Sequence, residues 1–179
     1  MHRSISWMTA VVFVLAALSG CAQYRITQDL TQPIEQPANC SIGEIGDGLP
    51  VDMAAEDRPS LENIGKLKNY LREKLGKKKV FASVMASDPN AGYEVVGAVL
   101  EYKKGSGCVR YIGLFGAGNA KLTVELRLID KKSGDVLFAG NFKQKVSSWM
   151  ESGAKTFERV ADDFAKALEK QWKKQQRGK

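Results

Sequence analysis

Histidine is nearly absent from this chain of 179 residues, because His2, in the N-terminal segment, is the only one. If that segment is removed as a leader, the mature chain has no imidazole. A Ser-His-Asp triad, a Cys-His pair and a histidine-based zinc site are then excluded. We therefore expect a non-enzymatic protein with no cofactor and no metal site.

Long hydrophobic runs are also lacking. The longest, Trp7 to Leu18, is interrupted only by Thr9 and follows a start that carries one basic residue, Arg3. Its length of about 12 residues suits the core of a signal peptide and falls short of the roughly 20 that a spanning helix needs. Residues 1–20 are therefore predicted to be a signal peptide rather than a transmembrane anchor.

The end of this run predicts a lipoprotein. Small side chains precede a cysteine, as a signal peptidase requires, and the predicted recognition residues are Leu18, Ser19 and Gly20. Cys21 is the predicted lipidation site, because only a thiolate is nucleophilic enough to accept the diacylglycerol. Ala22, rather than an aspartate, resembles the outer-membrane sorting pattern of enteric lipoproteins. The body would then face the periplasm; the alternative is a secretory peptide, or a short anchor, with an incidental cysteine.

Acidic residues are outnumbered, with 27 Lys and Arg against 20 Asp and Glu and a net charge of +7. Loss of residues 1–20 would remove Arg3 and no acid. A basic surface suits an acidic partner, an anionic lipid surface or a cell-wall polymer, although it can equally be a solvated surface without a partner. Nucleic acid is not expected, because an exported protein rarely meets it.

Only three cysteines are present. Once Cys21 carries lipid, Cys40 and Cys108 remain as an even pair in an oxidising compartment. A disulfide would close a loop of about 69 residues and add roughly 4 kcal/mol of stability on the chain-entropy model. The alternative is two separate thiols.

The pattern after the leader predicts a single domain. Residues 21–39, rich in Gln, Thr and Pro, read as a lipidated flexible tether, residues 40–174 as the domain, and residues 175–179 as a basic tail. Ser60 is the predicted N-cap of a helix that ends near Gly76. Its apolar face is Leu61, Ile64, Leu67, Leu71 and Leu75.

The remaining segments predict mainly strands. Period-two alternation or β-rich composition marks Cys40–Ile45, Val80–Met85, Tyr93–Tyr102, Ala120–Asp130 and Asp135–Val146. A final amphipathic helix spans about Glu151 to Lys173. The fold class is therefore α+β, a two-layer sandwich of a mostly antiparallel sheet with two amphipathic helices on one face. The alternative for the last helix is that its apolar stripe lies on a membrane.

The glycine-rich segment 105–118 contains no G-x-G-x-x-G before a helix and no Gly-Lys-Ser/Thr ending, so no nucleotide is expected. Bulky apolar side chains alternate with its glycines. They are candidate partner contacts, or else they close the edge of the core: Tyr111, Ile112, Leu114 and Phe115.

The run from Phe115 to Asp130, followed by Ser133-Gly134 and Val136-Leu137, resembles a family of bacterial lipoproteins known only as a domain of unknown function. Members share a G-x-G, an alternating strand ending in Asp, and a Ser/Thr-Gly turn. Leu71 to Phe81 resembles their first helix and next strand, and Tyr93 to Gly107 their central strand.

The same layout is more distantly similar to the periplasmic domain of the curli secretion pore lipoprotein and to transport-auxiliary lipoproteins. The resemblance implies no catalytic residue. It implies an accessory or scaffold component of an envelope assembly or transport system, held on the membrane by its lipid and in contact with envelope proteins or with copies of itself. A binding module for an acidic envelope ligand is the alternative.

Overall fold

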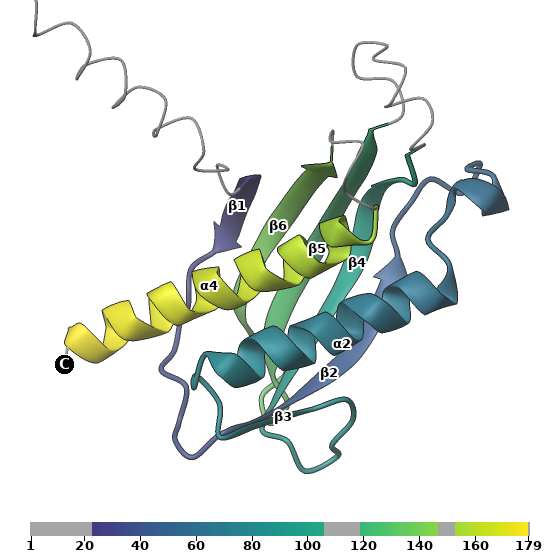
Figure 1. Cartoon of the computed structure of the whole chain (residues 1–179). Coiled ribbons are helices and arrows are strands. Elements are labelled where there is room, and N and C mark those ends of the chain that lie inside the picture. Colours follow the sequence, from purple (N-terminus) through teal and green to yellow (C-terminus); the bar gives the residue numbers. More distant parts are fainter. Residues whose placement is uncertain (1–22, 106–118, 147–152, 179) are drawn as a thin grey trace, which may run out of the picture.

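The computed structural model describes residues 23–105, 119–146 and 153–178, which form one sheet and two long helices (Figure 1). The sheet has six strands in the order β1-β6-β5-β4-β2-β3. The bounds are β1 Gln23–Gln28, β2 Asn39–Asp47, η1 Ala55–Asp57, α2 Leu61–Lys77, β3 Ser83–Met85, β4 Tyr93–Lys103, β5 Ala120–Asp130, β6 Val136–Val146 and α4 Lys155–Arg177. Both long helices cover the same face of the sheet, and the predicted α+β fold class is confirmed.

Strand β5 has the bounds that its alternating sequence predicts. Its buried side chains alternate with half-exposed ones along nearly its whole length, as expected when one face of a strand is covered. It pairs antiparallel with β4 on one side and with β6 on the other. The turn to β6 uses Gly134 at a φ of 79°, a conformation that favours glycine, and the Gly134 N–H donates to the Asp130 carbonyl at 2.8 Å.

Helix α2 begins and packs as its sequence predicts. The Ser60 hydroxyl accepts a hydrogen bond from the Asn63 N–H at 3.3 Å, which caps one of the free donors of the first turn. Leu67, Leu71 and Leu75 are fully buried against the sheet and α4. The spacing of three and four residues therefore identified the covered face from Ile64 to Leu75. It was wrong for Leu61, which lies in the first turn of the helix and is 91% exposed.

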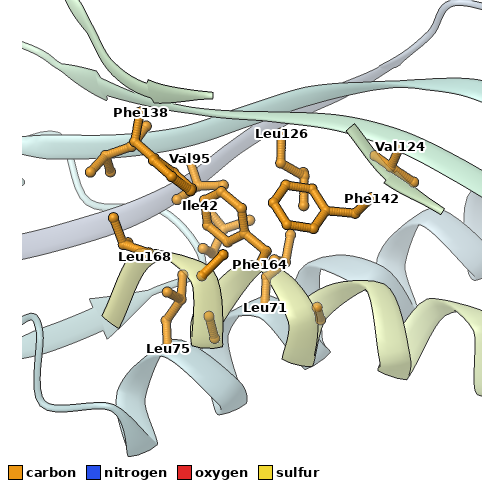
Figure 2. Packing of buried hydrophobic residues seen from close by; sticks show 14 of the residues in the cluster. Ile42, Leu71, Leu75, Val95, Val124, Leu126, Phe138, Phe142, Phe164 and Leu168 are labelled. Atoms are coloured by element: carbon orange, nitrogen blue, oxygen red, sulfur yellow. The ribbon is translucent and has the colours of Figure 1, made fainter. Parts of the chain in front are cut away.

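Helix α4 buries its apolar stripe on the sheet (Figure 2). The stripe is therefore part of the core, and the alternative that it lies on a membrane is wrong for this structure. The Phe164 ring lies edge-on to Phe142, with centroids 5.4 Å apart, and 5.7 Å from the ring of Phe138 in the same strand. The helix continues to Arg177, through most of the predicted basic tail. The Gln175 side-chain amide donates to the Leu30 carbonyl at 2.7 Å, so this end of α4 packs on the chain rather than extending as a tail.

The predicted flexible tether over residues 21–39 is wrong for the part that the structure describes. Residues 23–28 form the edge strand β1, paired antiparallel with β6, and the segment that follows buries Leu30, Ile34 and Ala38 in the core. The segment is mostly polar, so its three apolar side chains were not predicted to be buried. Their burial stabilises the segment. The folded body therefore already includes residues 23–39, rather than starting at Cys40.

The predicted strand Val80–Met85 is shorter than expected, because β3 covers only Ser83–Met85. Val80 and Phe81 are buried core residues of the preceding connection, and the Phe81 ring lies 5.9 Å from that of Tyr93. β3 and β4 both pair parallel with β2, while the remaining pairs are antiparallel. The strands and both helices that the structure describes lie within residues 23–177.

Candidate interaction face

The face of the sheet opposite the helices is the candidate functional surface, which we call the open face. Most side chains on this face of the three longest strands are charged, polar or small, with Val96 and Ile129 as apolar exceptions, and most are half-exposed. Strand pairing places them in rows across the sheet. The pairing register of the strands determines which charged side chains of the open face are neighbours.

The row nearest one end of the sheet consists of lysines. Lys103 of β4 pairs with Lys121 of β5, and Lys121 pairs with Lys145 of β6. Directly opposed side chains on neighbouring strands have Cβ atoms about 5 Å apart, so like charges in these positions destabilise the sheet. We call these three residues the lysine row.

The next row contains the single carboxylate that faces these cations among the described residues. Glu101 accepts a hydrogen bond from the Thr123 hydroxyl at 3.0 Å, and its oxygens lie 3.3 Å from Lys143 Nζ and 3.8 Å from Lys121 Nζ. Burial alone would raise the pKa of Glu101, but the hydrogen bonds and the two ammonium groups outweigh it and lower the pKa below its usual value. Glu101 is therefore ionised at neutral pH and offsets only part of the positive charge.

This charged end of the sheet is also where the chain enters the fold. Figure 1 shows β1 beside β6. Gln23, the first residue of β1, pairs with Lys143 of β6. Cys21 precedes Gln23 by two residues, a span of at most about 7 Å. Lys145 lies two residues beyond Lys143, about the same distance along β6. The predicted lipidation site is thus within a short reach of the lysine row.

Farther from this end, the open face is more evenly balanced in charge. Arg25, Asn141, Glu125 and Ala98 form one row across four strands, and Arg127 lies in the row after it. Arg127 Nε and Asn141 Oδ1 are buried atoms without a hydrogen-bond partner among the described residues. Arg127 Nε lies 3.9 Å from Glu125 Oε2, an ion pair without a hydrogen bond. Buried polar atoms are normally hydrogen-bonded, so these two are exceptions in the described part of the sheet.

The residues predicted from sequence for lipidation and partner contact lie outside the described residues. These are Leu18, Ser19, Gly20, Cys21, Tyr111, Ile112, Leu114 and Phe115. The structure therefore leaves their roles as predictions. In the ranges that it describes, no helix is long and apolar enough to cross a membrane, and no group of three or more His, Cys, Asp or Glu side chains is placed to hold a metal ion.

Cys40 is a free, fully buried thiol in β2. Burial raises the pKa of this thiol to about 12, so it carries almost no reactive thiolate at neutral pH. Its predicted disulfide partner, Cys108, lies outside the described residues, and the pairing stays a prediction.

The lysine row was not predicted from the sequence. Alternation in Ala120–Asp130 does place Lys121 on the wet side of its strand, but it says nothing about which residues of β4 and β6 are opposite. Register depends on bulges, such as the one between Val99 and Glu101. Without that bulge, Lys103 would not be opposite Lys121.

Comparison with protein families gives one match. The profile of a family described as "Domain of unknown function (DUF4410)" matches residues 50–152, more than half of the chain. The matched range includes α2, β3, β4, β5 and β6 and therefore about half of the core residues, whereas β2 and α4 lie outside it. The comparison with curated proteins gives no match.

Solved structures with the same fold are distant in sequence. PelC from Paraburkholderia phytofirmans, described as a dodecamer, is 13% identical with a TM-score of 0.60, over 83% of this chain and 97% of its own. A Xanthomonas campestris protein of the family DUF330 is 12% identical with a TM-score of 0.51, over 88% and 96%. A minor lipoprotein from Acinetobacter baumannii is 16% identical over 78% and 95%, but at a TM-score of 0.36. At these identities the first two likenesses show a shared fold, and the third is too weak to carry an argument.

Proposed function

We propose that this chain is a lipid-anchored, non-catalytic component of an assembly in the cell envelope. The proposal starts from the family: the chain belongs to the family described as a domain of unknown function (DUF4410). Cys21 carries the lipid, and the body faces the periplasm. Ala22 after that cysteine favours the outer membrane over the inner one. The partners are envelope proteins or further copies of this chain.

The observation that carries the proposal is the start of β1 at Gln23. A protein tethered by a long linker could diffuse widely around its anchor. Here about two residues separate the lipid from the folded body, so the body is held against the membrane in a restricted orientation. Such a fixed orientation suits a subunit that must present one face to its neighbours.

The open face is the surface that this subunit would present. Both helices are packed on the opposite face of the sheet, and the open face carries many charged side chains, among them Arg25, Glu125 and Arg127. PelC shares the fold and is described as a dodecamer. Self-association is therefore the first class of partner to test.

Replacing Cys21 with serine should move the protein from the membrane fraction to the soluble periplasmic fraction. A hydroxyl cannot take the place of the thiolate in lipid transfer, so the covalent anchor is lost. Washing the membranes at high salt removes any electrostatic contact between the body and lipid headgroups. Cell fractionation with immunodetection, together with mass spectrometry of the mature N-terminus for acyl groups, measures the change. Cys40→Ser is the matched control and should stay in the membrane fraction. A Cys21→Ser protein that fractionates like the parent would remove the anchor from the proposal.

A photo-crosslinking amino acid placed on the open face should capture neighbouring proteins in intact cells. Arg25 and Asn141 are suitable positions, because they are paired side by side in β1 and β6 on that face. Arg72, exposed on the outer side of α2, is the control position and should give little product. Mass spectrometry then identifies the captured protein, and a product of twice the subunit mass indicates self-association.

Equal crosslinking from Arg72 and from the open face, in wild-type cells, would contradict the proposed orientation. Loss of the open-face products in the Cys21→Ser background would support it, because release from the membrane lowers the local concentration on which weak contacts depend.

A further inference from the structure

We propose that the lysine row, Lys103, Lys121 and Lys145, binds the phosphate groups of anionic phospholipids in the membrane that holds the Cys21 lipid. This inference rests on the proposed anchorage for its location, and on the register and charge of the sheet for its chemistry. It assigns a lipid contact to the body of the protein in addition to the covalent lipid.

The first argument is that the lysine row has no evident structural role. Three ammonium groups on adjacent strands repel one another, and cross-strand pairing keeps them from moving far apart. Glu101 contacts only Lys121 within the row and shares its charge with Lys143. Lys103 and Lys145 form no ion pair among the described residues. A cluster that is costly in the isolated protein is favourable when it meets an anion.

The second argument is position. The lysine row lies at the end of the sheet where β1 begins, and Cys21 is two residues from that point. Lysine side chains are long and flexible enough to extend their ammonium groups beyond the last row of a sheet towards a headgroup. An acylated Cys21 therefore brings the lysine row to the membrane surface without any rearrangement of the fold.

The third argument is geometry. The lysine row spans two strand spacings, about 10 Å, and presents three separate point charges rather than a closed pocket. Lys donates to phosphate as a point charge with no fixed direction, unlike the planar guanidinium of Arg, so a row of Lys suits several mobile headgroups at once. Anionic lipid attracts basic groups that lie within a Debye length of its surface.

The basic end of α4 is the competing surface. It carries Lys170, Lys173, Lys174 and Arg177, but Lys173 is paired with Glu169 at 2.6 Å. The hydrogen bond from Gln175 to the Leu30 carbonyl places this end of α4 beyond the C-terminal end of β1. It is thus a strand length, roughly 20 Å, from the end that leads to Cys21.

The test uses the mature chain lacking Cys21 and its lipid, so that binding does not depend on the anchor. Sedimentation measures its binding to vesicles of phosphatidylcholine with phosphatidylglycerol and to vesicles of phosphatidylcholine alone. The wild-type chain should bind the anionic vesicles only, and binding should weaken steeply with salt. Replacing all three residues of the lysine row with glutamine should weaken binding about a hundredfold.

The matched control replaces Lys170, Lys173 and Lys174 with glutamine, which removes the same charge from α4, and it should bind nearly as the parent does. The Lys103→Gln, Lys121→Gln, Lys145→Gln chain should melt at the same temperature as the parent or higher, because the substitution relieves repulsion. Unchanged binding of that chain, a larger loss in the α4 control, or no binding by the wild-type chain at low salt would each overturn the inference. None of these results bears on fractionation of the acylated protein, so the proposed anchorage is tested separately.

Discussion

Replacing Phe164 with alanine is expected to lower the free energy of unfolding by about 4 kcal/mol. The Phe164 ring is fully buried at the centre of the layer between α4 and the sheet, where it meets Phe138 and Phe142 of β6 (Figure 2). Alanine loses the transfer free energy of the ring and leaves a cavity that two rigid layers cannot close. Urea unfolding followed by circular dichroism measures the change, and the melting temperature should fall by about 10 °C.

Leu61→Ala is the control for this substitution. Leu61 is 91% exposed, so loss of its side chain should change the free energy of unfolding by less than about 0.5 kcal/mol. A Phe164→Ala protein with a stability close to that of the Leu61→Ala protein would mean that α4 is not packed on the sheet in solution. The membrane-lying alternative for this helix would then have to be reconsidered.

Replacing Gly97 with alanine is expected to cost about 3 kcal/mol, although it adds only one methyl group. A Cβ at this position would lie 2.3 Å from the Glu125 carbonyl oxygen and 2.8 Å from Leu126 Cδ2. The nearest atom belongs to the backbone of β5, so β4 and β5 would have to separate at the centre of the sheet. Denaturant unfolding of the purified chain measures the loss.

Gly65→Ala is the same chemical change with the opposite expected sign. Gly65 lies within α2, and a Cβ there would meet no atom within 4 Å apart from the adjoining residues and backbone of its own helix. Alanine in a helix interior is more stable than glycine by about 0.5 to 1 kcal/mol, chiefly because the unfolded chain has less conformational freedom to lose. If Gly97→Ala were also stabilising, the close approach of β4 to β5 would be incorrect.

Local pattern predicted those elements whose burial follows a simple period. The alternation of Ala120–Asp130 and the leucine spacing of α2 each identify a covered face, because side chains repeat every two residues in a strand and every 3.6 in a helix. The same reasoning failed for residues 23–38. Its apolar side chains are too widely spaced to form a period, and the segment is held by elements that come later in the chain. β1 pairs with β6, Leu30 accepts a hydrogen bond from Gln175 of α4, and Gln36 donates one to the Val80 carbonyl.

The candidate functional residues also include some that the sequence predicts and some that it does not. Cys21 and the residues before it are recognised by enzymes that read an extended peptide, so that prediction needs no fold. The lysine row consists of residues from three strands, of which Lys103 and Lys145 are 42 positions apart in the chain. Only the pairing of β4, β5 and β6, shifted by a bulge, makes them neighbours.

The sequence by itself determined the predicted lipid attachment at Cys21, the excess of positive charge and the α+β fold class, because each follows from composition or from a short repeating pattern. The tertiary structure decided that the body begins two residues after the predicted anchor and that three lysines are side by side at that end of the sheet. Strand register brings together residues that are distant in the chain, and no local pattern encodes it.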